Sequence, residues 1–359
     1  MSDLRQTIRY CKAPNGMAIA WSTMGSGPPV VECRVAGHLE NELRNVPSVP
    51  FLRALSERHT LIRYNGRGVG LSDQPFDEVS LENSVADLEC VVDAAGVDRF
   101  ALVARTSGCA ESVTYAARHP ERVSRLVVIG GFAGGSARAA YSNDFRFKRD
   151  AIVAAIEAGW DDPNPGFRRL FLSRRFPRAT PEEMASMERY TLTAGSGRFG
   201  AAMIRYQANS DLSELATRVR CPALILHGLR DIWVPLSSGR ALASLVPNAR
   251  LVALDTDASD PLPSDPAFSV LLREVLDFLG EERDPTKADV VPFADLTARE
   301  RDVLELIARG LDNLQIAAHL NISEKTVRNN ITPIFDKLGV ENRAQAIVKA
   351  RDAGMGKAK

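Results

Sequence analysis

The 359-residue sequence is poor in histidine, with five, and it carries no excess charge, because 45 basic residues balance 45 acidic ones. A neutral total gives no hint of a nucleic-acid or membrane partner, although it can hide a difference between domains. The five cysteines are scattered, without a CxxC pair or a Cys/His metal spacing, so we expect reduced thiols, no metal, no cofactor and a cytoplasmic location. No apolar run approaches the roughly 20 residues of a membrane helix, so we expect no membrane partner.

The first part of the chain alternates compact apolar runs with segments of helical periodicity. We expect strands at 6–11, 17–23, 30–35, 60–64, 100–104 and 125–129, and helices at 81–95 and 110–119. Strand signals disappear from 132 to 216 and resume at 223–227 and 250–254. This pattern predicts an α/β domain with a mostly parallel sheet and a helical cap at 132–216. Such an insertion usually covers a pocket at the carboxyl ends of the strands.

A polar, proline-bounded stretch at 281–292 divides a larger domain at 1–280 from a smaller one at 293–359. The smaller domain is predicted to be all-helical. Thr297 and Glu300 have the spacing of a helix capping box, and short helices are expected at 313–320, from Ser323 onward, and at 342–350. Two short helices joined by a tight turn at 319–323 indicate a helix-turn-helix unit.

The helix that follows Ser323 has the residues of a DNA major-groove reader. The exposed positions of its first turns are Lys325, Thr326, Arg328, Asn329 and Asn330. Cationic side chains bind phosphates, and amide side chains bind adenine edges. The alternative is a four-helix docking module with solvated charges, since 293–359 carries 11 basic and 9 acidic residues and is only weakly basic.

The C-terminal segment resembles the LuxR-type DNA-binding domain. The match runs through LTARERDVL at 296–304, IA at 316–317, ISEKTV at 322–327 and KLGV at 337–340, and it covers nearly all of 296–351. The resemblance implies binding of double-stranded DNA as a homodimer, with Lys337 among the contacts. Two residues depart from the family pattern: Asn330 stands where a histidine is common, and Pro333 lies inside the recognition helix, where we expect a local kink.

The larger domain resembles the α/β-hydrolase fold from about residue 8 to 279, through NGRGVGLSD at 65–73, the elbow ARTSG at 104–108 and LHGLRD at 226–231. Enzymes of this fold use a serine on a strained G-x-S-x-G elbow, then an acid, then a histidine. By this resemblance Thr106 takes the nucleophile position, Ser107 follows it, and Asp231 takes the acid position. Ser259 stands in the loop where the histidine is expected.

No histidine occurs between Asp231 and the smaller domain, so the triad base is missing in the expected order. His38 is the best substitute, as either a pocket residue or a structural loop histidine. His227 is expected to be structural, and His59 and His119 to be exposed. Loss of triad members lowers rates by orders of magnitude, so we expect no catalytic residues and no hydrolase activity of the usual kind.

The residue before the elbow threonine, Arg105, is predicted to lie at the pocket floor. A buried arginine needs a partner; Asp231 is favoured slightly over an anionic ligand held bidentately. The set predicted to line a degenerate, ligand-binding pocket is His38, Arg105, Thr106, Ser107, Asp231 and Ser259. Five cap arginines could add cations, although most are expected to be solvated: Arg146, Arg168, Arg169, Arg174 and Arg175.

These observations favour a DNA-binding transcriptional regulator whose hydrolase-like domain binds a small-molecule effector, an anion in the alternative where Arg105 holds a ligand. Effector binding would change how the two DNA-binding domains of a dimer contact their half-sites. One alternative is an active hydrolase that uses Thr106 and is tethered to DNA. Another is a hydrolase-like domain that serves dimerisation or protein interaction alone.

Overall fold

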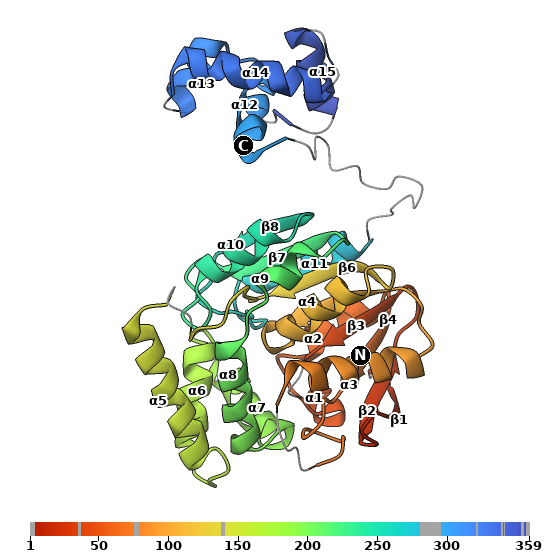
Figure 1. The fold of residues 1–359 in the computed structure, drawn as a ribbon. Helices are drawn as coiled ribbons and strands as arrows, with labels where there is room; N and C mark the ends of the chain where they lie inside the picture. Colours follow the sequence, from red (N-terminus) through yellow and green to blue (C-terminus); the bar gives the residue numbers. More distant parts are fainter. Residues whose placement is uncertain are drawn as a thin grey trace. The chain divides into compact units, whose positions relative to one another are not determined.

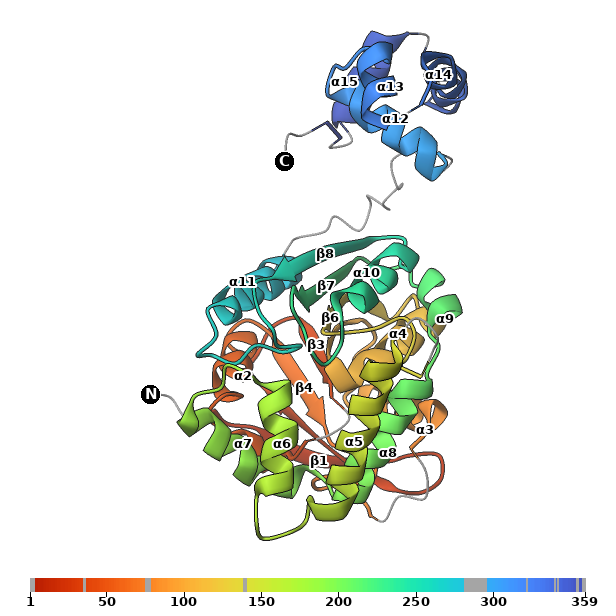
Figure 2. The ribbon, with the colours of Figure 1, turned by 90° about the vertical axis from the view of Figure 1, so that its left-hand side faces the viewer.

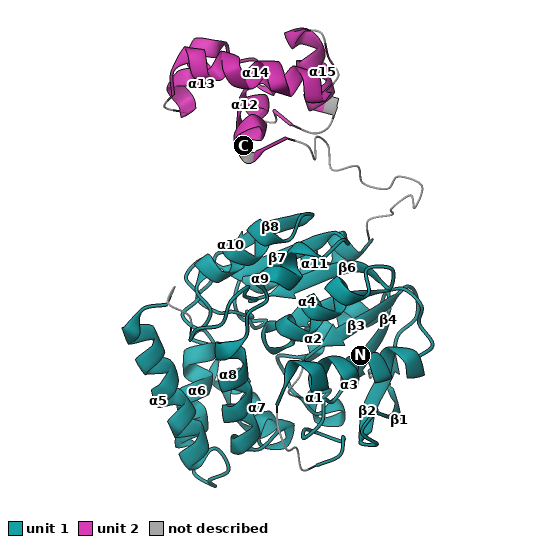
Figure 3. Ribbon diagram, in the orientation of Figure 1, with its two compact units in different colours: residues 1–281 teal, residues 282–359 magenta. Residues whose placement is uncertain are grey.

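The computed structural model describes residues 4–34, 37–74, 79–137, 141–280, 296–320, 322–338, 340, 342–352 and 355–356. The chain divides into two compact units, 1–281 and 282–359 (Figure 3). The segment predicted to be a linker, 281–292, lies outside the described residues.

The first unit is built around one eight-stranded sheet (Figure 1). Its strands are β1 (Thr7–Lys12), β2 (Ala18–Met24), β3 (Pro29–Cys33), β4 (Thr60–Tyr64), β5 (Phe100–Arg105), β6 (Val123–Ile129), β7 (Ala223–Gly228) and β8 (Ala249–Leu254). They lie in the order β1-β2-β4-β3-β5-β6-β7-β8. The hairpin β1–β2 and the pair β2–β4 are antiparallel, and the other neighbours are parallel. The predicted mostly parallel sheet is therefore confirmed.

Helices cover both faces of this sheet, and side chains of β5 alternate between them. Leu102 and Ala104 point to one core, which also receives apolar residues of α3 (Leu81–Ala94), α4 (Cys109–Arg118) and α10 (Leu236–Leu245). Ala101 and Val103 point to the other core, which is closed by α2 (Val49–Ser56) and α11 (Ala267–Gly280). A strand buried on both faces reads as a continuous apolar run, which is why its position could be predicted.

The helical insertion between β6 and β7 forms a group of helices beside the sheet (Figure 2). It comprises α5 (Asn143–Gly159), α6 (Gly166–Arg175), α7 (Pro181–Ala194), α8 (Gly197–Asn209) and α9 (Ser213–Thr217). Helix α7 begins with a capping box between Thr180 and Glu183, which fixes its first turn. Helices α5 and α8 bury Ile152, Ile156 and Ala201 against each other. These contacts make the insertion a packed layer of its own.

The second unit consists of α12 (Ala298–Ala308), α13 (Asn313–Leu320), α14 (Glu324–Leu338) and α15 (Arg343–Asp352). The predicted capping box at Thr297 and Glu300 is present. Val303, Ile307 and Val327 belong to the buried core. Helix α14 is continuous across Pro333. Within the described residues, no helix has the length and apolarity needed to cross a membrane, and His, Cys, Asp and Glu side chains form no metal-binding group of three.

Candidate functional site

The elbow after β5 has the backbone strain of a nucleophile turn. Thr106 has a φ of 39°, the one positive value at a non-glycine residue in the described part of the chain. Such a conformation costs about 1–2 kcal/mol, and in this fold it exposes the side chain at the top of the sheet. Two residues on, a Cβ on Gly108 would lie 1.9 Å from the Cys33 carbonyl oxygen, so the close approach of the turn to β3 requires glycine.

Arg105 forms buried ion pairs that the sequence did not predict. Its Nε and Nη2 lie 3.1 and 2.8 Å from Asp260 Oδ2, and its Nη1 lies 3.4 Å from Glu32 Oε1. The predicted partner, Asp231, is therefore wrong, and the role of Arg105 as a pocket cation is wrong with it. The register explains the Glu32 contact, because Glu32 pairs with Val103 of the adjacent strand, two residues before Arg105 and on the same face.

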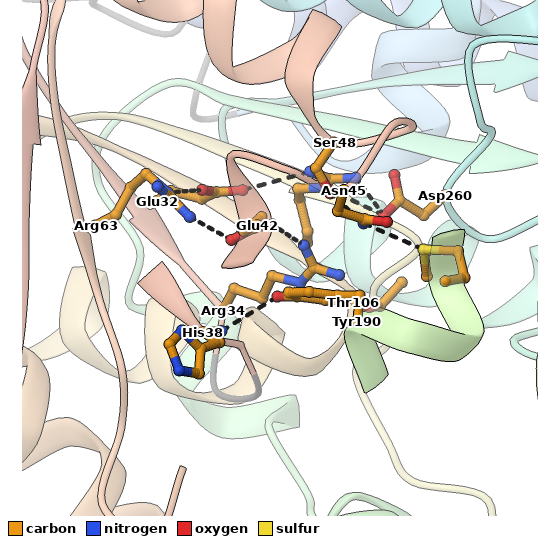
Figure 4. Close-up of polar contacts among 12 residues, drawn as sticks. Glu32, Arg34, His38, Glu42, Asn45, Ser48, Arg63, Thr106, Tyr190 and Asp260 are labelled. Atoms are coloured by element: carbon orange, nitrogen blue, oxygen red, sulfur yellow. Dashed lines mark hydrogen bonds and ion pairs between the residues drawn. The ribbon is translucent and has the colours of Figure 1, made fainter. Parts of the chain in front are cut away.

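This ion pair belongs to a buried network that extends across three strands (Figure 4). Arg63 donates to Glu32 at 3.2 Å and also to Glu42, and Arg34 donates to Glu42 from the other side. With Arg105 and Asp260, the network holds three guanidinium groups and three carboxylates. The charges within these direct pairs therefore balance. Buried ions need such compensation, because each one loses its hydration.

Asp231, at the position of the triad acid, is fixed by hydrogen bonds from the turn that follows it. Asp231 Oδ1 accepts hydrogen bonds from the Trp233 and Val234 amides at 2.8 and 3.0 Å. Oδ2 lies 3.5 Å from Nε2 of His227, which donates to the Val234 carbonyl at 2.7 Å. Burial raises the pKa of Asp231, and the Ser259 hydroxyl, the Val234 amide and His227 oppose that rise. Asp231 therefore lies beside both His227 and Ser259, and Ser259 belongs to the loop where the triad histidine was expected.

Ser259 and Thr106 meet at Gly130, which follows β6. A Cβ on Gly130 would lie 2.9 Å from Ser259 Cβ and 3.0 Å from Thr106 Cγ2. Ser259 Oγ is buried and makes no well-formed hydrogen bond, although it lies close enough to influence Asp231. The structure thus places Thr106 and Ser259 next to the same glycine and Ser259 next to Asp231, whereas Arg105 pairs with Asp260.

His38 has a capping role. Its Nδ1 accepts a hydrogen bond from the Asn41 amide at the start of α1 (Leu39–Glu42), and its own amide donates to the Tyr190 hydroxyl of the cap (Figure 4). These contacts fit the alternative in which His38 is a structural loop histidine. His59 is 4% exposed and lies against the Leu55 carbonyl, so the prediction of an exposed side chain is wrong. Burial lowers the pKa of His59.

A cavity of about 140 Å³ lies between the cap and the elbow. Its floor includes Ser107, whose carbonyl accepts from Gln207 of α8. Its walls are apolar and aromatic side chains of the cap, and they include Ile156, Trp160, Phe171, Leu172, Phe176, Met187, Phe199, Met203 and Ile204, together with Trp233. Two cations line it, Arg34 and Arg175. A carboxylate does not line it in the part of the chain that the structure describes.

Arg175, the last residue of α6, points into this cavity and donates from Nη2 to the Thr106 hydroxyl oxygen. The other cap arginines have different partners: Arg168 binds the Trp160 carbonyl, and Arg169 pairs with Glu188 at the surface. Arg175 lies three residues after buried Leu172 on the inner stripe of the helix. Spacing alone does not single out Arg175, because Arg168 and Arg169 lie four and three residues before Leu172.

In the second unit, α14 presents its polar face outward. Val327 and Ile334 are buried, whereas Lys325, Arg328 and Asn329 are exposed. Arg328 Nη2 lies 3.2 Å from Glu324 in its own first turn. This is the geometry expected of a groove-reading helix.

Besides Arg328, three of the predicted DNA-contact residues have partners within the unit. The Thr326 amide is capped by Ser323 at 3.1 Å, and Asn330 donates to the Thr326 carbonyl at 2.7 Å. Lys337 is paired with Glu300 at 2.7 Å, so DNA would have to compete with the capping-box carboxylate for this ammonium group.

The comparisons with known proteins agree with this arrangement of two units. The model of the alpha/beta hydrolase fold matches residues 41–260, and that of the luxR family of bacterial regulatory proteins matches 294–350. Among curated proteins, the "Putative carbamate hydrolase RutD" of Klebsiella pneumoniae is 28% identical over 206 residues, which cover 56% of this chain and 74% of the relative. The protein of that name from Shigella flexneri is 24% identical over 240 residues, which cover 66% and 88%.

Solved structures show the same fold for the first unit. A hydrolase from Pseudomonas aeruginosa PA01 has a TM-score of 0.62 at 23% identity, covering 77% of this chain and 99% of its own. An esterase from Exiguobacterium antarcticum has a TM-score of 0.64 at 18% identity, covering 76% and 99%. At these identities the likeness concerns the fold alone. The hydrolase-fold model spans more than half of the sequence, and the chain therefore belongs to the alpha/beta hydrolase fold family and carries a C-terminal domain of the luxR family of bacterial regulatory proteins.

Proposed function

We propose that the protein is a transcriptional regulator in which the hydrolase-fold unit is a ligand sensor and the luxR-type domain binds DNA as a homodimer. One observation carries the sensor role: a cavity under the cap lies over an elbow whose hydroxyl is bound by a cation, Arg175. The luxR-type domain supports DNA binding. A protein of this kind acts inside the cell, where its DNA is.

The contacts at Thr106 argue against turnover. A catalytic hydroxyl needs a base that accepts its proton, and Arg175 has donors but no acceptor. Ser259 faces Asp231 where the fold places its histidine, and His227 is fully buried against the Val234 carbonyl. We therefore infer that the site retains the shape of an active site without its proton transfer.

Sensing requires that the ligand prefer one state of the protein over another. The cavity is lined mainly by cap helices, whereas its floor belongs to the sheet domain, so an occupant contacts both layers. A ligand that fixes the cap against the elbow would favour one arrangement of the dimer. That dimer arrangement would determine how the two α14 helices contact their DNA half-sites.

The second candidate function is hydrolysis, and it is favoured by the name of the curated relatives, "Putative carbamate hydrolase RutD". In that case Thr106 would be the nucleophile. The chemistry would need a base recruited from outside the triad positions, and ester turnover that is lost in a folded Thr106→Ala variant would separate this function from sensing.

DNA binding is tested with the full chain and sequences selected from a random duplex library. We expect selected duplexes to bind more tightly than the starting pool, and Lys325→Ala and Arg328→Ala each to lower affinity and reduce the salt slope by about one. Lys337→Ala should reduce the slope less, because Glu300 already neutralises that ammonium group. Equal binding by the wild type, Lys325→Ala and Arg328→Ala would contradict the placement of α14 in the groove.

A further inference from the structure

The cavity under the cap has the size and the walls of a site for one aromatic ring. Its volume is about 140 Å³, and an apolar protein cavity of about 150 Å³ accommodates benzene. Trp160, Phe171 and Trp233 line it and stand edge to face in a row, with ring centroids 5.5 and 5.4 Å apart. Aromatic side chains arranged in this way offer further edge-to-face contacts to a ring placed among them.

Arg175 gives one end of this cavity a charge without a counter-ion. Within the described residues it makes no ion pair, whereas Arg34, Arg63 and Arg105 are paired with carboxylates of the buried network. Asp260 and Asp231 attract it from a longer range. Burial, and next the charge of Arg34, lower the pKa of Arg175 to about 10, so the group is still cationic at neutral pH.

The donors of Arg175 are largely available to a ligand. A guanidinium group has five N–H donors, and the hydrogen bond to Thr106 uses one nitrogen, Nη2. Arg34 lines the same cavity, stacked near the Tyr190 ring at 5.9 Å. Ser107, the residue after Thr106, also lines the cavity.

We propose that this cavity binds a small aromatic monocarboxylate, with its carboxylate on Arg175 beside Thr106 and its ring among the aromatic side chains of the cap. The inference rests on the proposed sensor function for its biological meaning. A neutral ligand would leave the Arg175 charge uncompensated in an apolar surround, and a cationic ligand would be repelled. A planar carboxylate matches the paired donors of a guanidinium group.

The test is isothermal titration of the full chain with benzoate and with its neutral analogue benzamide. The wild type is compared with Arg175→Gln and with Arg169→Gln. The second variant removes the same charge from the same helix, at a side chain that is 60% exposed and outside the cavity. Arg175→Lys keeps the charge and loses the planar pair of donors. Tryptophan fluorescence and the melting temperature establish that each variant is folded.

We expect benzoate to bind the wild type with a Kd below about 1 mM, and benzamide to bind at least about tenfold more weakly, because hydrogen bonds to charged groups contribute about 1.5–3 kcal/mol. Arg175→Gln should weaken benzoate at least about tenfold and leave benzamide nearly unchanged, with Arg175→Lys intermediate and Arg169→Gln like the wild type. Equal affinity for the two probes, no binding of benzoate by the wild type, or an unaltered benzoate Kd in a folded Arg175→Gln variant would each overturn the proposal.

Measuring DNA affinity with and without benzoate separates this inference from the proposed function. Benzoate that binds through Arg175 without changing DNA affinity would support the site and contradict its regulatory role. A ligand of another chemical class that changes DNA affinity would support the regulator and overturn the carboxylate assignment.

Discussion

Removing Asp260 should destabilise the first unit strongly, because the 3.4 Å contact with Glu32 would then be the remaining ion pair of Arg105 among the described residues. Both side chains of the Arg105–Asp260 pair are 5% exposed. Loss of one partner from a buried ion pair costs about 3–5 kcal/mol, since the remaining charge stays buried without compensation. We therefore expect Asp260→Asn to lower the free energy of unfolding by about 3–5 kcal/mol.

A double-mutant cycle measures the interaction energy between Arg105 and Asp260. Arg105→Met should also destabilise, while the double variant Arg105→Met/Asp260→Asn should lose less than the sum of the two single changes by about 0.5–3 kcal/mol. Asp257→Asn is the matched control: it lies in the same loop, its side chain is 29% exposed, and it pairs with arginines at the surface. A surface pair of this kind contributes about 0–1 kcal/mol.

Urea unfolding followed by tryptophan fluorescence measures this unit alone, because Trp21, Trp160 and Trp233 all lie within 1–281. An Asp260→Asn variant within about 0.5 kcal/mol of the wild type, or strictly additive single changes, would refute the assigned pairing, since such small effects are typical of uninvolved surface positions.

Two further predictions concern the base of the elbow. Glu111 on α4 is fully buried, and burial raises its pKa from 4.5 to about 7. The folded state therefore holds the Glu111 proton more tightly than the unfolded state does. The stability that this proton contributes is complete below pH 4.5 and is lost as pH rises through about 7. Glu111→Gln should abolish this loss of stability, which is about 3 kcal/mol at 1.36 kcal/mol per pKa unit. Unfolding curves at pH 5 and pH 8 measure it. The same pH dependence in the wild type and the variant would contradict the prediction. Gly108→Ala should destabilise the unit by about 1–3 kcal/mol or more, because its Cβ would meet the Cys33 carbonyl oxygen at 1.9 Å; an unchanged melting temperature would count against this close approach.

The sheet could be predicted because its strands carry local signals. The run at 60–64 coincides with β4, and that at 100–104 falls one residue short of the end of β5. Buried parallel strands are continuously apolar and are bounded by turn residues, so a short window of sequence suffices. The helices of the second unit were predicted for a similar reason, since Thr297, Ser323 and their partners cap them locally.

The site was predicted in part. The elbow spacing placed Thr106, and chain order placed Asp231 and Ser259, because the fold fixes which strand ends carry these positions. The partner of Arg105 could not be predicted, since Asp260 is 155 residues away and the path of the loop after β8 decides which carboxylate arrives. Arg34 was missed, although it directly follows β3, where pocket residues of parallel sheets gather.

The most direct test of the sensor account is hydrolysis of p-nitrophenyl butyrate by the purified full chain, compared with the Thr106→Ala variant. The account predicts equal rates for the two proteins, because Arg175 binds the Thr106 hydroxyl and Ser259 stands where the base is needed. Turnover by the wild type that Thr106→Ala abolishes, in a variant that is folded, would contradict the account and identify the first unit as an enzyme.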